Sequence, residues 1–81
     1  MANAALRNSQ TTISSDQALK IARTDAEGVY RDLSIYRIGV SLEDNGWLVD
    51  YELKDQQLHG GGPHYVIDAH TGEILTKRYD Q

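Results

Sequence analysis

Three histidines, His59, His64 and His70, lie close together near the end of the chain and are the first candidates for chemistry. Imidazole is a common ligand for transition metals, and the carboxylate of Asp68 could add an oxygen ligand. The spacing does not match a helical H-x-x-x-H pair, however, and His70 falls in a predicted turn. We therefore expect exposed polar histidines and neither a metal nor another cofactor, with a metal site as the alternative.

Two carboxylates, Asp50 and Glu52, are separated by one residue, so they share one face of a predicted strand. Paired carboxylates can perform acid–base catalysis when burial raises the pKa of one of them. Nothing in the pattern predicts such burial, and no Ser-His-Asp arrangement follows from the spacing. The pair fits a solvated acidic face, or a docking surface for a basic protein partner.

Residues 60–62 are three consecutive glycines, followed by Pro63. A phosphate-binding loop requires G-x-x-x-x-G-K-[ST] before a helix, whereas here a proline and a predicted strand follow. The glycines indicate a tight bend or a close approach to another backbone, or else a mobile loop that binds a partner. The predicted partner-binding residues are Asp50, Glu52, His59, Gly60, Gly61, Gly62 and His64.

Composition narrows the classes of partner. The chain has 81 residues, enough for one domain with a modest core, and it contains no cysteine for disulfides or thiolate chemistry. Its net charge of −4 argues against a nucleic-acid partner or an anionic membrane surface. No apolar run approaches the ~20 residues of a transmembrane helix.

Residues 1–12 are small and polar, which predicts a disordered tail before a domain at residues 13–81. This tail has no apolar core like that of a secretory signal. The sequence therefore leaves the compartment open. It is the bacterial cytoplasm or, if a signal peptide has been removed, the periplasm or the cell exterior.

A helix is predicted from Ser14 or Ser15 to about residues 30–32, because Ser14 and Gln17 have the spacing of a capping box. Small apolar residues at helical spacing predict one buried face that approaches a sheet closely. These residues are Ala18, Ala22, Ala26 and Val29. The charged residues expected mostly on the opposite side are Lys20, Arg23, Asp25 and Glu27.

Four strands are predicted after the helix. Residues 36–43 alternate between apolar and polar side chains, and residues 43–46 (EDNG) predict a hairpin because Asn-Gly suits a type I′ turn. The apolar face of this first strand is Tyr36, Ile38, Val40 and Leu42, and that of the second is Trp47, Val49, Tyr51 and Leu53.

The phase of Trp47 favours a core position over an exposed anchor for a partner. Strands at about 64–68 and 73–79 follow, joined by a turn from Asp68 to Gly72. The predicted fold is therefore α+β, with one N-terminal helix packed on a four-stranded antiparallel meander sheet.

Three segments resemble the NTF2-fold immunity proteins of bacterial polymorphic toxin systems: residues 17–22 (QALKIA), 46–51 (GWLVDY) and 60–75 (GGGPHYVIDAHTGEIL). This resemblance implies a non-enzymatic protein that neutralises a toxin by binding it. The chain is short for a complete NTF2-like domain.

Residues 65–75 also closely resemble the terminal hairpin of PepSY domains. That resemblance implies a module that binds or inhibits a peptidase. Either family implies a cystatin-like unit with a helix on a sheet, and neither supplies catalytic residues.

The leading prediction is a non-enzymatic bacterial binding protein, with an immunity function first and a PepSY-like function as the alternative. The expected partner is thus a toxin or a peptidase. A homodimer through an exposed edge strand is also open.

Overall fold

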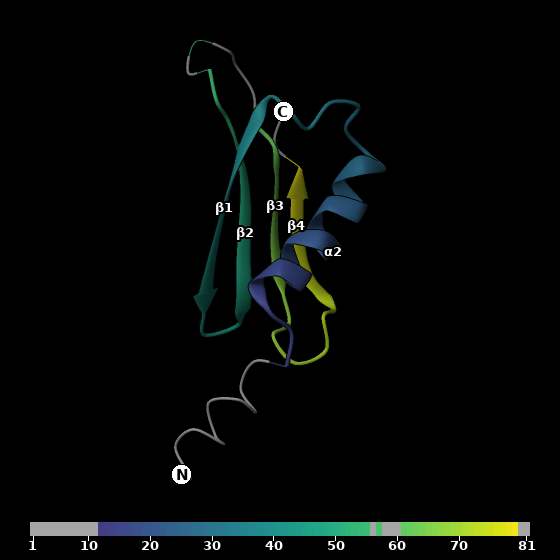
Figure 1. The fold of residues 1–81 in the computed structure, drawn as a ribbon, viewed down its shortest axis with the longest axis vertical. Helices are drawn as coiled ribbons and strands as arrows, with labels where there is room; N and C mark the ends of the chain where they lie inside the picture. Colours follow the sequence, from purple (N-terminus) through teal and green to yellow (C-terminus); the bar gives the residue numbers. More distant parts are fainter. Residues whose placement is uncertain (1–11, 56, 58–60, 80–81) are drawn as a thin grey trace, which may run out of the picture.

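The computed structural model describes residues 12–55, 57 and 61–79. One helix, α2 (Ser15–Glu27), precedes four strands. These are β1 (Tyr36–Glu43), β2 (Gly46–Leu53), β3 (Pro63–Ile67) and β4 (Ile74–Tyr79). They form one antiparallel sheet in the order β1-β2-β3-β4, and α2 lies across one face of it (Figure 1). The predicted fold class is confirmed.

The predicted domain boundary at residue 13 stays a prediction, because the tail at residues 1–12 lies outside the described residues apart from Thr12. Among the residues that the structure does describe, no helix is long and apolar enough to span a bilayer.

The start of α2 is the predicted capping box. The Ser14 hydroxyl accepts a hydrogen bond from the Gln17 amide at 3.1 Å, and the Gln17 side chain accepts one from the Ser14 amide at 2.8 Å. Two amide groups that the helix would leave unpaired are thereby satisfied.

The predicted end of the helix was wrong. Helix α2 ends at Glu27 because Gly28 has low helix propensity, and the amides of Gly28 and Val29 bond to carbonyls three residues back. Val29, predicted on the buried stripe, is 53% exposed. The chain turns here so that Tyr30 packs edge-on against the rings of Tyr36 and Tyr79.

The core lies between α2 and the middle of the sheet. Ala18, Ala22 and Ala26 are fully buried, which confirms the predicted close approach of helix and sheet. They face the buried side chains of Val49, Tyr51, Tyr65 and Ile67. Trp47 packs at the margin of this cluster, and its indole N–H donates to the Ile13 carbonyl at 2.8 Å, so its predicted core-side position is confirmed.

Strand β1 departs from the prediction. Tyr36 is buried, but Ile38 and Leu42 on the same face are 47% and 51% exposed. A single helix is too narrow to cover four strands, and α2 crosses the sheet over β2 and β3 (Figure 1). The apolar face of β1 is therefore left largely open to solvent.

Both hairpins form, with different turn chemistry. No non-glycine residue in the described ranges has a positive φ, so Asn45 does not adopt the type I′ turn that was predicted, and Gly46 takes a φ of 142° instead. The Asp68–Gly72 turn forms as predicted. Gly72 has a φ of 80°, and the Asp68 carboxylate accepts from the amides of His70 and Thr71. Strands β3 and β4 match the predicted ranges to within one residue.

Candidate functional site

Two of the predicted partner-binding residues meet on the face of the sheet that α2 does not cover, which we call the open face. Asp50 of β2 lies directly opposite His64 of β3 in the strand register. The His64 Nδ1 atom is 2.6 Å from the Asp50 Oδ1 atom, and the side chains are only 19% and 35% exposed. A contact this short between half-buried groups holds the imidazole in one orientation.

The chemistry available to this pair follows from its neighbours across the sheet. The register places Gly39, Asp50, His64 and Arg78 in one row over the four strands. An aspartate that orients a histidine is also part of catalytic triads, but a triad needs a nucleophile next to the imidazole. This row contains no hydroxyl or thiol. It offers hydrogen-bond donors and acceptors of both charges, which suits recognition of polar groups.

Apolar side chains adjoin the pair. A shallow hollow of about 330 Å³ on the open face is lined by Leu48, Asp50, His64, Val66, Thr76 and Arg78, among others. Leu48 and Val66 face each other across β2 and β3 and are half-buried. The open face therefore combines a small apolar patch with fixed polar groups.

The predicted acidic face is a face of mixed charge. Glu52 shares the open face with Asp50, as predicted, but it lies opposite Arg37 of β1, with the nearest charged atoms 3.8 Å apart. Arg78 adds a second positive charge beside His64. Arg37 of β1 and Arg78 of β4 therefore place positive charge near the two carboxylates. The sequence of a single strand does not show this, because it depends on how the strands pair.

The glycine segment is only partly described, since His59 and Gly60 lie outside the described residues. Gly62 is buried where a Cβ atom would lie 2.7 Å from the Tyr51 carbonyl oxygen, so the predicted close approach to another backbone is confirmed. The carbonyl of Gly61 accepts a long hydrogen bond, 3.4 Å, from the Tyr36 hydroxyl.

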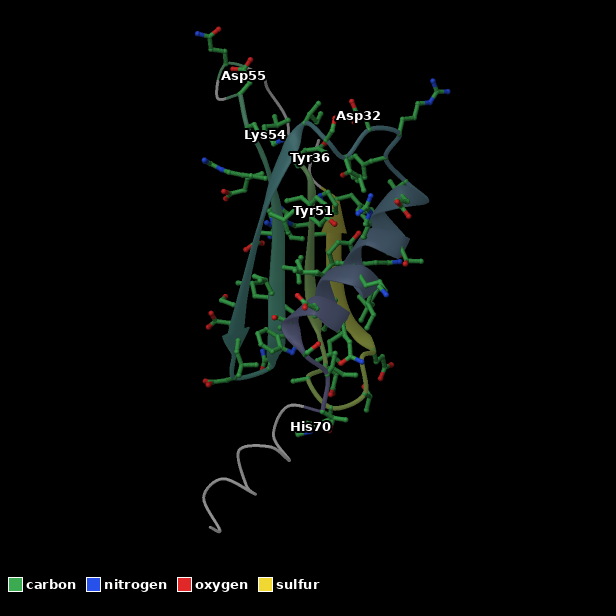
Figure 2. The ribbon with its side chains drawn as sticks, viewed as in Figure 1. Asp32, Tyr36, Tyr51, Lys54, Asp55 and His70 are labelled. Atoms are coloured by element: carbon green, nitrogen blue, oxygen red, sulfur yellow. The ribbon has the colours of Figure 1, made fainter. Side chains whose placement is uncertain are left out.

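The remaining histidine does not join His64. His70 lies in the turn after β3, whereas His64 lies near the start of that strand, and Figure 2 shows His70 at the opposite end of the sheet from Lys54 and Asp55. Within the described ranges, no three His, Asp or Glu side chains gather as metal ligands. The carboxylate of Asp68 instead accepts hydrogen bonds from the amides of His70 and Thr71, which lower its pKa.

The sequence reasoning missed a second polar cluster, between the helix and the sheet. The Asp25 carboxylate accepts hydrogen bonds from the hydroxyls of Tyr65, at 3.0 Å, and of Tyr79. The Lys77 ammonium lies 3.1 Å from the other oxygen of the Asp25 carboxylate. Asp25 was predicted mostly on the outward side of the helix. It follows the buried Ala18 by seven residues, two helical turns, and that spacing could have placed it at the sheet.

The hydrogen bonds within this cluster shift the pKa values of its members. The bond from Tyr79, aided by those from Lys77 and Tyr65, lowers the pKa of Asp25 against the opposing effect of desolvation. Burial and the bond to Asp25 raise the pKa of Tyr65, and the bond to Asp25 also raises the pKa of Tyr79 and of Lys77. At neutral pH the carboxylate is ionised and its partners are protonated, so the cluster ties α2 to β3 and β4.

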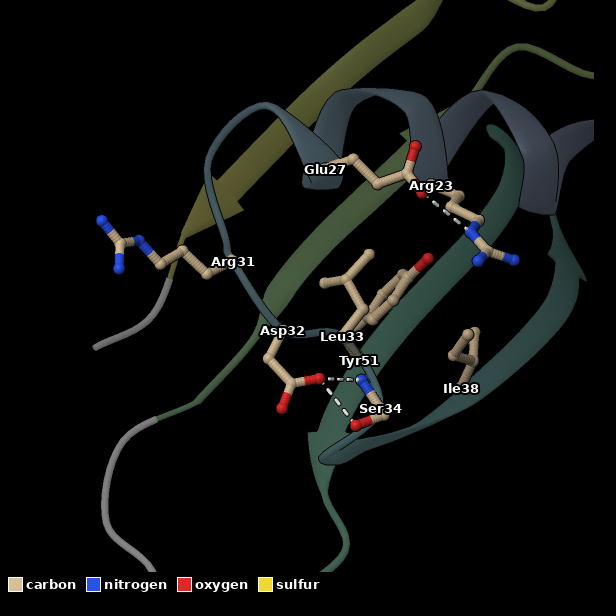
Figure 3. Close-up of a pocket in the computed structure, with 8 residues that line it drawn as sticks. All are labelled: Arg23, Glu27, Arg31, Asp32, Leu33, Ser34, Ile38 and Tyr51. Carbon is tan, nitrogen blue, oxygen red and sulfur yellow. Dashed lines mark hydrogen bonds and ion pairs between the residues drawn. The ribbon is translucent and has the colours of Figure 1, made fainter.

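A second hollow lies beside the C-terminal half of α2 (Figure 3). Tyr51 reaches into it from β2, near Leu33 and Ile38, and its hydroxyl is buried with no hydrogen-bond partner among the described residues. Burial raises the pKa of this hydroxyl. The rim is occupied by local pairs, Arg23 with Glu27 at 3.2 Å and Asp32 with the Ser34 hydroxyl at 2.6 Å.

Comparison with known families gives one relevant match. The model of the family described as PepSY, the peptidase propeptide and YPEB domain, matches residues 12–78, which include α2 and almost all of the sheet. Neither the curated proteins nor the solved structures give a match. The match agrees with the resemblance in residues 65–75, and the comparisons give no support to the resemblance to NTF2-fold immunity proteins.

Proposed function

Because the chain belongs to the PepSY family, we propose that it is a non-catalytic module that binds a peptidase. The observation that carries this proposal is the family match over residues 12–78. The family description names a peptidase propeptide, and a propeptide acts on its peptidase by contact. The match spans the helix and all four strands, so it concerns the whole described domain.

The open face is the proposed docking surface. Among the residues that the structure describes, no helix covers it, and its hollow contains the Asp50–His64 pair beside the half-buried Leu48 and Val66. A pair that is already held in place loses little conformational freedom on binding, which favours affinity. The apolar neighbours supply area that a partner can bury. Glu52 and Arg37 form a polar rim beside it.

The chemistry of the open face suits the recognition of polar groups on a partner. The row through Gly39, Asp50, His64 and Arg78 supplies hydrogen-bonding groups without a nucleophile. His59 and Gly60 remain predicted contacts. Gly62 has a structural role in its close approach to Tyr51, so we expect it to act on the partner only through the shape of the loop.

The proposal is tested by affinity capture. The tagged full chain is used as bait in a lysate of the source cell, and captured proteins are identified by mass spectrometry. Variants Asp50→Asn and His64→Gln each remove one member of the pair, and Asp44→Asn removes the same charge as the first variant but at the exposed tip of the β1–β2 hairpin. We expect a peptidase on the wild-type chain and on Asp44→Asn, with roughly tenfold less on the other two variants.

Three results would count against all or part of the proposal. Capture of no peptidase by the wild-type chain would remove the peptidase partner. Capture of a toxin-like protein in its place would favour the immunity function that the other resemblance implies. Equal capture of a peptidase by all four proteins would keep the partner and exclude the Asp50–His64 surface.

A further inference from the structure

Strand β1 is an unprotected sheet edge. In the part of the chain that the structure describes, its only strand neighbour is β2, so the other side of its backbone has no strand partner. The five residues 38–42 (IGVSL) carry no charge, and Ile38 and Leu42 are about half exposed. Proteins usually protect such edges with charged residues or proline, because an open edge pairs readily with another strand.

The opposite edge of the sheet is protected. Strand β4 carries the adjacent basic residues Lys77 and Arg78, both exposed. Pairing of two copies of β4 about Lys77 would place two Lys77 side chains opposite each other across the seam, which is unfavourable. The two edges therefore differ, because the centre of β1 carries no charge whereas β4 carries two basic residues.

We propose that β1 pairs antiparallel with β1 of a second copy of this chain, with Val40 on the two-fold axis. Even-numbered residues of β1 lie on the helix side of the sheet and odd-numbered residues on the open face, as their partners in β2 show. Antiparallel partners must share a face, so only registers that pair even with even residues keep both faces intact.

Charge selects one of these registers. With Val40 opposite itself, Ile38 lies opposite Leu42 of the second copy, and Arg37 lies opposite its Glu43. The two exposed apolar side chains then cover each other, and each dimer contains two pairs of opposite charge. A shift by two residues in either direction loses both charge pairs. The self-complementarity is what a two-fold symmetric interface requires.

The contacts within one copy leave these side chains available. Arg37 and Glu52 are both more than 60% exposed and 3.8 Å apart, so their interaction is weak. Glu43 is exposed and accepts a local hydrogen bond from the Ser41 hydroxyl. On the open face, a Cβ atom added at Gly39 would meet no other described atom within 4 Å, so this face of β1 is uncovered there. The dimer keeps the Asp50–His64 hollow accessible, so this inference is independent of the proposed function.

The first test uses two charge-reversal variants, alone and mixed with each other. Sedimentation equilibrium measures the mass of the assembly at low salt, because surface charges are least screened there. Arg37→Glu gives an edge with two acidic ends, and Glu43→Arg gives one with two basic ends. We expect each variant alone to dimerise roughly tenfold more weakly than the wild type, because both cross-strand pairs become like-charged. An equimolar mixture restores opposite charges in both pairs and is expected to recover the wild-type dimer.

Disulfide trapping tests the register. The chain has no cysteine, so single substitutions are unambiguous. Val40→Cys is expected to cross-link on mild oxidation, since opposite residues on paired strands lie about 5 Å apart. Ile38→Cys and Leu42→Cys are expected to cross-link only when mixed.

A monomer at every concentration up to about 1 mM, a concentration at which even millimolar affinity would be visible, would overturn the inference. A dimer that resists both charge reversals, or that traps in another register, would also overturn it. Open-ended assemblies would point to pairing of β1 with β4 and would exclude the two-fold dimer.

Discussion

Asp25 is the residue whose side chain connects the two layers of this small domain. Its carboxylate accepts from Tyr65 and Tyr79 of the sheet and from Lys77, while its own side chain is 21% exposed. A carboxylate in this position adds stability only while it is ionised, because its partners donate to the charged form.

The stability of the protein should therefore depend on acid through Asp25. Its pKa is lowered in the folded state, so the unfolded chain binds more protons in the acidic range. The stabilisation is complete above the ordinary aspartate pKa of about 4 and is lost as pH falls through the lower folded value. We expect Asp25→Asn to lower the free energy of unfolding at pH 7 by about 1–3 kcal/mol and to flatten its fall below pH 4.

Urea denaturation at several pH values measures both effects, with Asp16→Asn as a charge-matched control on the exposed side of the same helix. Asp32 and Asp68 also have lowered pKa values, so some acid dependence remains in the variant. Superimposable acid profiles for Asp25→Asn and the wild type would show that the cluster does not act in this way.

Two buried tyrosines should respond in opposite ways to loss of the hydroxyl. Tyr65 donates to Asp25, and its replacement by phenylalanine should cost about 1–2 kcal/mol. Tyr51 has a buried hydroxyl without a partner in the described residues, so Tyr51→Phe should leave stability unchanged or raise it by up to about 1 kcal/mol. The midpoints of urea unfolding compare the two variants. A large loss for Tyr51→Phe would mean that this hydroxyl has a partner.

Individual residues were predictable where their contacts are local. The Ser14–Gln17 box and the Asp68 turn follow from spacing within a few residues of the chain. The pairing of Asp50 with His64 depends on a register between strands, and the position of Asp25 depends on how the helix rests on the sheet. Both are tertiary facts, which single-strand patterns do not contain.

At the scale of elements, the loop before β3 is fixed by packing. Gly62 lies where a Cβ atom would approach the Tyr51 carbonyl oxygen, the Tyr51 Cβ and the Tyr36 ring to within 2.7–2.9 Å. These neighbours are backbone or buried ring atoms, so they cannot easily move aside. The glycine is therefore required by the neighbouring strand, and a ligand is not needed to explain it.

The comparison of Gly62→Ala with Gly39→Ala tests this view. We expect the first substitution to lower the free energy of unfolding by about 1–3 kcal/mol through overpacking. The second adds a methyl group in open space, and replacing a strand glycine should leave stability unchanged or raise it by up to about 1 kcal/mol. Thermal or urea unfolding measures both. Equal effects would contradict the assigned role of Gly62.

Existence and order of the elements were predictable because each has a clear period or turn signal. The predictions failed where the burial or the length of one element depends on how it packs against another. The alternation in β1 correctly predicts a strand, but its burial depends on how far a single helix extends over the sheet (Figure 1). The helix stops at Glu27, before Gly28, and the chain turns so that Tyr30 packs against Tyr36 of the sheet, a tertiary contact that the apolar pattern up to Val29 does not show.

At the largest scale, the described part of the chain is a two-layer unit in which one helix covers one face of the sheet. This leaves two surfaces with different properties. The open face carries Asp50 and His64 in a hollow, and the β1 edge carries Ile38 and Leu42 between opposite charges. Neither surface is required for the packing of the core, so both are available for contacts with other proteins. This agrees with the binding role that we propose for this member of the PepSY family.

We propose that this domain binds a peptidase through the open face. Isothermal titration of the purified captured peptidase with the full chain measures this most directly. We expect saturable binding at one domain per peptidase, roughly tenfold weaker for Asp50→Asn and His64→Gln and unchanged for Asp44→Asn. Absence of binding, or the same affinity for the wild type and all three variants, would contradict it.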